Sequence, residues 1–187
     1  MISEQFQTVG RDLFARGLVS SNSGNLSIRL GEQIIITRRG SMLNCLSEND
    51  LIETGISKNS RTTPLASTDL LIHRAIYRET QALAIVHAHP PHAVALSITE
   101  KEIVPNVEDF SLIGTVPVVG WSEELQKECL DDIVARALQQ HHIIMVHNHG
   151  SFAVGQLLDE AYNLTTAFEE MCHVLCLLRS LQVSTAD

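Results

Sequence analysis

Two histidines close an apolar segment that is typical of a buried strand, Ala84-Ile85-Val86-His87-Ala88-His89-Pro90-Pro91. Because alternate side chains of a strand point to the same face, His87 and His89 project in one direction, with Cβ atoms roughly 6.5 Å apart. Two imidazoles at that separation can bind one metal ion. Pro90 has no amide proton to donate to a sheet, so the strand is expected to end there, at a rim that ligands can reach.

A second apolar segment, His142 to Gly150, also ends in histidines, as Val146-His147-Asn148-His149-Gly150. Two strand ends of this kind can supply three imidazoles to one ion, which predicts a metal centre. The alternative is a pair of unrelated core strands whose histidines are incidental. The spacing of the residues leaves both interpretations open, although it favours the metal.

The composition indicates an ordinary globular chain. Hydrophobic residues make up 44% and charged residues 19% of the 187 residues, which is enough for a sizeable core and predicts one domain over residues 1–187. The net charge of −9 and the absence of a long basic run argue against nucleic acid as a partner. No apolar stretch approaches the roughly 20 residues of a membrane helix, and no secretory signal is evident, so we expect a cytoplasmic protein.

The four cysteines do not form a CxxC pair, so neither a zinc knuckle nor a disulfide framework is indicated. Hydrophobic periodicity and turn residues predict alternating helices and strands. Helices are expected over residues 3–19, 70–79, 91–98, 122–140 and 159–181, and strands near residues 26–28, 33–37, 51–56, 84–89, 115–119, 142–147 and 151–154. Short hairpin-like turns between several strands favour a mixed sheet with helices on both faces over a doubly wound parallel sheet.

Two polar loops are candidate anion sites. The loop of residues 20–28, which contains Asn25, can present amides and hydroxyls to an anion, or it can be a plain turn. Arg38-Arg39-Gly40-Ser41 can clamp a phosphate or carboxylate, or it can be a solvated hairpin turn.

Asp69 has two interpretations. With Ser67 as the N-cap of the helix over residues 70–79, Asp69 lies in the first turn, where a carboxylate suits the helix dipole. Alternatively it is a catalytic acid or base at the mouth of the metal site. His73, one turn further along, is expected to be packed rather than ligating, and His92 to be packed or behind the site. Glu108 and Asp109 are further candidate site carboxylates, or merely solvated loop residues.

Five short motifs occur in the order and spacing of the class II aldolase/adducin family, which the chain resembles from about residue 5 to residue 180. They are Gly24-Asn25-Leu26-Ser27, Ile36-Thr37-x-x-Gly40, Ser67-Thr68-Asp69-x-x-x-His73, His87-x-His89 and Asn148-His149-Gly150. The family includes fuculose- and rhamnulose-phosphate aldolases and ribulose-5-phosphate 4-epimerase.

The resemblance implies a three-layer α/β/α sandwich with a mixed, mainly antiparallel central sheet, and a homotetramer. It implies a divalent metal, Zn²⁺ or else Mn²⁺ or Co²⁺, on His87, His89 and His149, and a phosphorylated sugar as substrate. By the same resemblance the phosphate is bound by the following residues: Asn25, Arg39, Gly40, Ser67 and Thr68. Asp69 takes the position of the catalytic acid/base.

The predicted activity is therefore that of a metal-dependent sugar-phosphate aldolase, a lyase that cleaves a ketose 1-phosphate by a retro-aldol reaction through a metal-stabilised enediolate. Two departures keep alternatives open. The aldolases usually carry Glu where this chain has Asp69, whereas the epimerase carries Asp at this position. The tyrosines of the aldolases have no counterpart, since this chain contains only Tyr77 and Tyr162. The alternatives are a 4-epimerase-like enzyme and a non-catalytic, adducin-like interaction domain.

Overall fold

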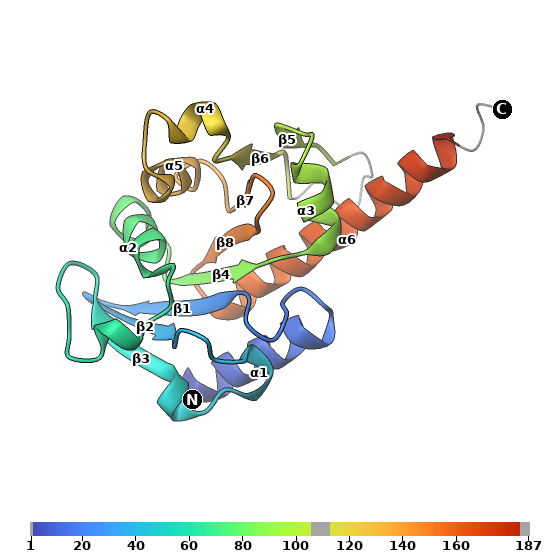
Figure 1. The fold of residues 1–187 in the computed structure, drawn as a ribbon. Coiled ribbons are helices and arrows are strands. Elements are labelled where there is room, and N and C mark those ends of the chain that lie inside the picture. Colours follow the sequence, from blue (N-terminus) through green and yellow to red (C-terminus); the bar gives the residue numbers. More distant parts are fainter. Residues whose placement is uncertain (1, 106–112, 184–187) are drawn as a thin grey trace.

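The structure is a computed structural model that describes residues 2–105 and 113–183 (Figure 1). Its helices are α1 (Ile2–Ala15), α2 (Leu70–Glu79), α3 (Pro91–Ser97), α4 (Ser122–Leu125), α5 (Leu130–Ala137) and α6 (Leu158–Val183). Its strands are β1 (Asn25–Leu30), β2 (Gln33–Thr37), β3 (Leu51–Gly55), β4 (Ala84–Ala88), β5 (Glu102–Ile103), β6 (Val116–Val119), β7 (Ile143–Val146) and β8 (Ser151–Gly155). None of these helices has the length and apolar character needed to cross a membrane.

The strands form one sheet in the order β3-β2-β1-β4-β8-β7-β6-β5. Strands β6 and β7 pair in parallel, whereas the other neighbouring strands among the described residues pair antiparallel. The predicted mixed, mainly antiparallel sheet is confirmed. Strand β4 lies in the interior of the sheet between β1 and β8, so its histidine-bearing end is flanked by chain on both sides.

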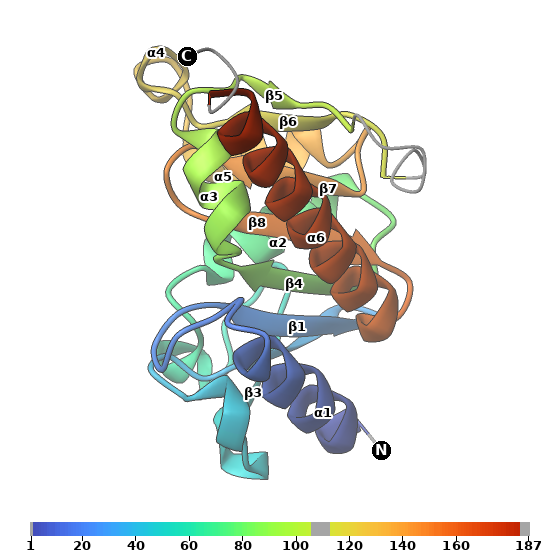
Figure 2. The same ribbon diagram turned by 90° about the vertical axis from the view of Figure 1, so that its right-hand side faces the viewer.

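Helices cover both faces of the sheet. Helices α1, α3 and α6 pack against one face (Figure 2), where Phe6, Leu96 and Phe168 belong to one apolar cluster. Helices α2 and α5 cover the opposite face, where Ile76 and Val134 belong to a second cluster. The three-layer α/β/α arrangement predicted from the sequence is therefore confirmed.

The side chains of β4 alternate between these two clusters, as a strand buried on both faces requires. Val86 belongs to the cluster of α1, α3 and α6, whereas Ile85 belongs to that of α2 and α5. His87 follows Ile85 at the interval of two, so it shares the face that α2 covers. This parity brings His87 towards the start of α2.

Two helices differ from the expectation. The helix expected over residues 3–19 ends at Ala15, because Gly17 adopts a left-handed conformation with φ of 71°. The single helix expected over residues 122–140 is wrong: the chain forms α4 and α5 instead. Each begins with its own pair of acidic residues, Glu123 and Glu124 in α4 and Asp131 and Asp132 in α5, so this segment contains two N-terminal signals.

A buried polar network links α2 to β1. The Ser27 hydroxyl oxygen lies 2.6 Å from His73 Nδ1 and 2.7 Å from the Tyr77 hydroxyl oxygen. His73 is fully buried, and burial lowers the pKa of its imidazole to about 4. His73 therefore packs inside the protein as a neutral side chain, as expected from its place in the helix, rather than joining the cluster of His87 and His89.

The depressed pKa of His73 makes the stability of the fold depend on pH. Below about pH 6.5 the unfolded chain binds a proton at this residue, whereas the native protein does so only near pH 4. The free energy of unfolding should therefore fall as the pH drops from 6.5 to 4, by about 3 kcal/mol for this group, since one pKa unit corresponds to roughly 1.4 kcal/mol.

Urea unfolding of chelator-treated protein at several pH values checks this, with His73→Gln as the comparison. Glutamine can still bond to Ser27 but does not titrate, so the variant should lose less stability than the wild type over this pH range. Parallel curves for the two proteins would contradict the assignment.

Candidate metal centre and active site

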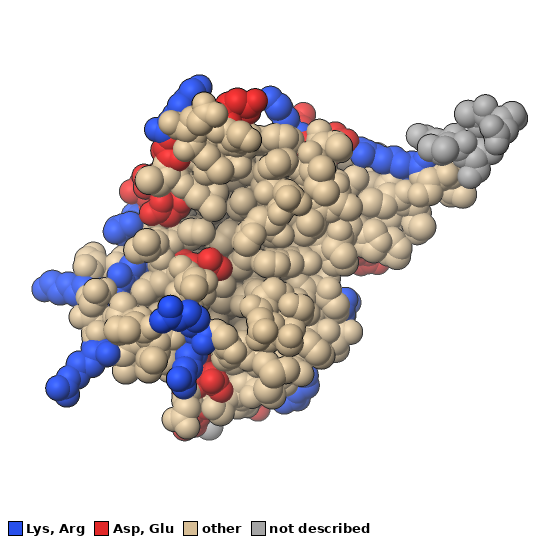
Figure 3. All heavy atoms as spheres, viewed as in Figure 1, with Lys and Arg blue, Asp and Glu red and all other residues tan. Residues whose placement is uncertain are grey.

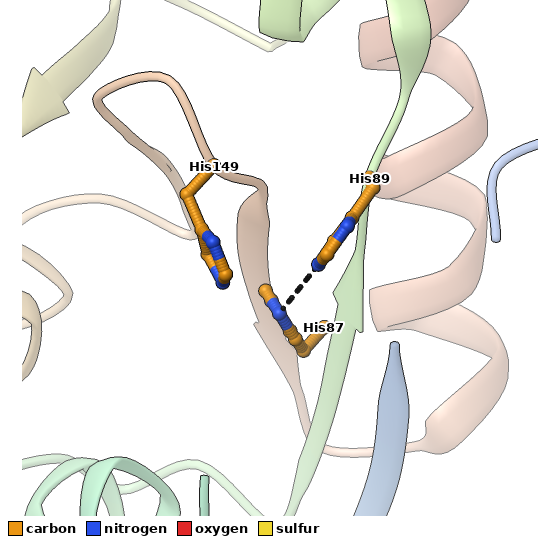
Figure 4. Close-up of side chains that lie close together, drawn as sticks. All are labelled: His87, His89 and His149. Carbon is orange, nitrogen blue, oxygen red and sulfur yellow. Dashed lines mark hydrogen bonds between the residues drawn. The ribbon is translucent and has the colours of Figure 1, made fainter. Parts of the chain in front are cut away.

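Three histidines converge at one end of the sheet, from two parts of the chain about 60 residues apart (Figure 4). His87 lies in β4, His89 follows the end of that strand, and His149 lies in the turn between β7 and β8. The Nε2 atoms of His87 and His89 are 3.1 Å apart, and one nitrogen from each of the three rings lies within 4.8 Å of the others. The predicted convergence of the two strand ends is thus present in the structure.

The pairing of β4 with β8 creates this cluster. Ala88 is opposite Ser151 in the antiparallel register, so the turn before β8 passes beside His87 and His89. A Cβ atom on Gly150 would lie 2.4 Å from the Ala88 carbonyl oxygen and 2.6 Å from His89 Cδ2. Only glycine allows the turn to pass this closely, which is the physical reason for the Asn148-His149-Gly150 sequence at this point.

The protonation state of His87 suits a metal ligand. Its Nδ1 lies 2.9 Å from the Ser151 carbonyl oxygen, which can only accept, so Nδ1 carries the proton and the lone pair of Nε2 faces the cluster. Burial lowers the pKa of His87 to about 3, and burial followed by the nearby His149 lowers that of His89. Both imidazoles are therefore neutral at physiological pH.

This donor set fits a divalent metal ion. Two nitrogens on one tetrahedral zinc ion are roughly 3.3 Å apart, close to the separation of the His87 and His89 Nε2 atoms. Three histidine ligands leave at least one coordination position for water or substrate, as in catalytic rather than structural zinc sites. The cluster could therefore bind a metal in a form that supports catalysis.

Asp69 lies beside the cluster at the start of α2. One of its carboxylate oxygens accepts a hydrogen bond of 2.7 Å from the Asn25 side-chain amide and lies 3.6 Å from His87 Nε2. Burial raises the pKa of Asp69, but the charge that His87 acquires at low pH and the hydrogen bond from Asn25 more than offset this and hold the pKa of Asp69 below its ordinary value. Asp69 is thus an anion held in a fixed orientation next to the histidines.

The start of α2 differs in detail from the sequence prediction. Asp69, rather than Ser67, occupies the N-cap position, and its side chain makes no capping hydrogen bond. The Ser67 hydroxyl instead accepts a bond of 3.2 Å from the Asp69 amide. The Asp69 carboxylate accepts its hydrogen bond from the Asn25 side-chain amide instead of from the first amides of the helix.

A cavity of about 210 Å³ joins these groups to the predicted phosphate site. Its walls include the three histidines, Asp69 and every residue assigned to the phosphate by resemblance, namely Asn25, Arg39, Gly40, Ser67 and Thr68. The loops that carry these residues lie side by side, since Arg38 forms a β-bridge with Ala66 and the Arg39 amide donates to the Leu65 carbonyl oxygen.

The cavity is also lined by residues that the resemblance did not assign to the phosphate, namely Asn22, Ser23, Gly24, Arg38 and Ser41. Arg38 and Ser41 flank the predicted pair Arg39 and Gly40 and also line the cavity. The Arg-Arg-Gly-Ser turn as a whole was the sequence signal for these residues, and both of its arginines line the cavity. Basic side chains project from the face near β2, β3 and α2, whereas acidic side chains lie among basic ones over α4 and α5 (Figure 3).

Other candidates lie elsewhere. Glu108 and Asp109 fall outside the described residues. His92 lies in the first turn of α3, with its Nδ1 2.7 Å from a Glu169 carboxylate oxygen. Within the part of the chain that the structure describes, His92 belongs neither to the cluster of three histidines nor to the wall of the cavity. This agrees with the expectation that His92 stands behind the site.

Known proteins resemble this chain along most of its length. The chain is 28% identical over 179 residues to the L-fuculose phosphate aldolase of Methanocaldococcus jannaschii, covering 95% of this chain and 97% of the relative. It is also 28% identical over 190 residues to a probable bifunctional methylthioribose-1-phosphate isomerase/methylthioribulose-1-phosphate dehydratase of Nocardia farcinica, covering 88% of this chain but 33% of that longer protein.

A solved structure agrees with the fold. The L-fuculose-1-phosphate aldolase of Thermus thermophilus matches with a TM-score of 0.87 at 33% identity, over 100% of this chain and 98% of that one. These similarities confirm the predicted class of enzyme, an aldolase-type lyase. The sequence profile described as Class II Aldolase and Adducin N-terminal domain matches residues 4–176. The chain therefore belongs to the class II aldolase and adducin N-terminal domain family.

Proposed function

We propose that this protein is a metal-dependent aldolase that cleaves a ketose 1-phosphate by a retro-aldol reaction. The observation that carries the proposal is the single cavity shared by three clustered histidines, an ionised carboxylate and the arginine-bearing turn. The proposal is also supported by the similar proteins that are named L-fuculose phosphate aldolase.

In this proposal His87, His89 and His149 hold a divalent ion, most suitably Zn²⁺, with Mn²⁺ or Co²⁺ as substitutes. When bound, the ion supplies Lewis acidity that stabilises negative charge developing on the substrate oxygens. The Ser151 carbonyl keeps the His87 lone pair directed at the cluster. Because His87 and His89 are neutral near pH 7, neither ring has to lose a positive charge before it can bind a metal ion.

Asp69 moves the proton in the proposed reaction. A carboxylate oxygen takes the proton of the substrate hydroxyl next to the bond that breaks, the hydroxyl carbon becomes the carbonyl of the released aldehyde, and the electron pair of the broken bond stays with the ketone fragment. The same proton then returns to the carbon of that fragment. Asn25 keeps the carboxylate facing the histidines through its 2.7 Å hydrogen bond.

The remaining cavity wall binds the phosphate. Arg39 supplies positive charge, Ser67 and Thr68 supply hydroxyl and amide donors, and Gly40 lets the phosphate approach the backbone. Asn25 completes the set. Binding energy from the phosphate fixes the orientation of the bond that breaks. We further propose, from the family resemblance, a cytoplasmic homotetramer.

A 4-epimerase-like reaction is the second candidate, and Asp69 is the feature that favours it. An epimerase would use the same bond cleavage but rotate the aldehyde and rejoin it. A non-catalytic, adducin-like role is less well supported, because a scaffold has no use for neutral histidines gathered beside an ionised carboxylate.

The proposal is tested by assaying metal-reconstituted protein on ketose 1-phosphates, including L-fuculose 1-phosphate. An aldolase releases an aldehyde and a ketone phosphate, whereas an epimerase conserves the carbon chain. Elemental analysis should find about one metal ion per chain, lost together with turnover in His149→Ala. Full turnover by metal-free wild type would exclude the proposed mechanism.

Replacement of Asp69 by Asn should remove the proton carrier but keep the shape of the side chain. We expect kcat to fall by about 100-fold or more, while the metal content stays that of the wild type, because Asp69 is not one of the three ligands. Steady-state kinetics together with elemental analysis measure both quantities. A kcat within a few-fold of wild type would show that another group carries the proton.

Replacement of Gly150 by Ala should disturb the metal centre without removing a ligand. The new methyl group would lie 2.9 Å from His87 Cε1 as well as against His89 and the Ala88 carbonyl, so the rings must shift. We expect metal affinity to fall by about 10-fold, measured by competition with a chelator. Gly31→Ala is the control for a glycine substitution away from the site: it strains a turn with φ of 61° but its Cβ atom meets nothing within 4 Å, so the metal affinity should equal that of wild type.

A further inference from the structure

Helix α3 contacts both histidine-bearing segments of the candidate metal centre. Its N-terminus follows His89 with only Pro90 between them. Near its other end, the buried Ser97 hydroxyl accepts a 3.1 Å hydrogen bond from the backbone amide of Asn148, the neighbour of His149. Helix α3 therefore connects the segment that carries His89 to the segment that carries His149.

The N-terminus of α3 is held by a carboxylate from another helix. Pro90 occupies the N-cap position and makes no side-chain capping bond, and Pro91 has no amide proton. The next two amides donate to Glu169 of α6: His92 N lies 3.0 Å from Oε1, and Ala93 N lies 3.1 Å from Oε2. Glu169 thus satisfies the two amides that the two prolines cannot serve.

Glu169 is unusual for its position. It is only 8% exposed and lies on the α6 face that packs against the sheet, next to the apolar residues Phe168 and Cys172. Burial of a carboxylate is costly unless its oxygens are hydrogen bonded, and here both oxygens are used. His92 Nδ1 donates a third bond of 2.7 Å to Oε1, and the His92 ring stacks on His173 of α6 at 4.2 Å.

The backbone of His89 is restrained on its other side as well. Its amide donates a 2.8 Å hydrogen bond to the carbonyl oxygen of Leu18, in the segment between α1 and β1. The two prolines limit the backbone rotation that follows. With the strand on one side and the helix bound to Glu169 on the other, His89 has little freedom to turn. Figure 2 shows α3 lying against α6, the helix that carries Glu169.

We propose that Glu169 is a positioning residue for the metal centre. By fixing α3 to α6 it sets the place of His89 directly and that of His149 through Ser97, so metal affinity depends on a carboxylate that does not itself face the cavity. This inference rests on the metal ligands of the proposed function. It adds α3 as the element that holds the two ligand segments in register.

The test is a titration of metal-free protein with Co²⁺, followed by its visible absorption and by competition with a chelator. In Glu169→Gln the amide group can accept at one oxygen only and must place an NH₂ against the second backbone amide. We expect Co²⁺ affinity to fall by about 10-fold, within the range found for residues that support metal ligands, and the absorption band to change in position or intensity. Glu170→Gln, which changes the adjacent exposed carboxylate on α6, is the matched control and should bind as wild type does.

A purely structural role predicts a different result. If Glu169 only caps α3, the Gln variant would melt at a lower temperature but bind Co²⁺ with wild-type affinity and spectrum, and that outcome overturns the inference. Should Glu169→Gln fail to fold, Ser97→Ala decides, since loss of the Asn148 bond should also weaken binding and unchanged binding would refute the role of α3. Failure of the wild type to bind Co²⁺ would overturn the proposed metal centre itself, and the inference with it.

Discussion

The antiparallel pairing of β4 with β8 is the contact on which the candidate site depends. With Ala88 opposite Ser151, the turn that carries His149 passes next to His87 and His89. A shift of one residue in this register would turn His87 to the other face of the sheet and move Ser151 away from its ring. Gly150 permits the close passage of the turn, because any side chain there would meet the Ala88 carbonyl and both imidazoles.

Burial favours the neutral form of every ionisable group gathered at this pairing, but the outcome differs between the histidines and the carboxylate. It favours the neutral form of His87 and His89, and no counter-charge reverses the effect. It also favours the neutral form of Asp69, yet the hydrogen bond from Asn25 favours the carboxylate, and the pKa of Asp69 stays below its ordinary value. The site therefore contains neutral nitrogen donors beside an anionic oxygen, which is the combination that metal binding and proton transfer require.

The helices on the two faces of the sheet hold the residues that surround the three histidines. On one face, α2 supplies Asp69 and is joined to β1 by the buried Ser27–His73–Tyr77 network. On the other face, α3 reaches both histidine segments and is bound to α6 through Glu169. The candidate metal centre is thus supported from both sides of the sheet, by polar contacts buried in otherwise apolar layers.

Much of this could be predicted from the sequence because the signals are local. Strand alternation placed His87 and His89 on one face, proline marked the end of the strand, and α2 has the predicted bounds. The family motifs pointed to the residues that line the cavity. Local patterns gave a wrong prediction for residues 122–140, where two acidic helix starts lie within one continuous stretch of helical periodicity. They also gave a wrong N-cap for α2, where the Asp69 carboxylate bonds to Asn25 instead of to the helix.

The sequence by itself determined which residues are candidates for the chemistry and which strand ends present them. Only the tertiary structure decided that His149 meets the other two histidines, that Asn25 orients Asp69, and that Glu169 supports α3 from 77 residues away. The physical reason is that these contacts join segments distant in the chain, and their geometry is set by strand register and layer packing. Neither of these can be read from the spacing of residues along one segment.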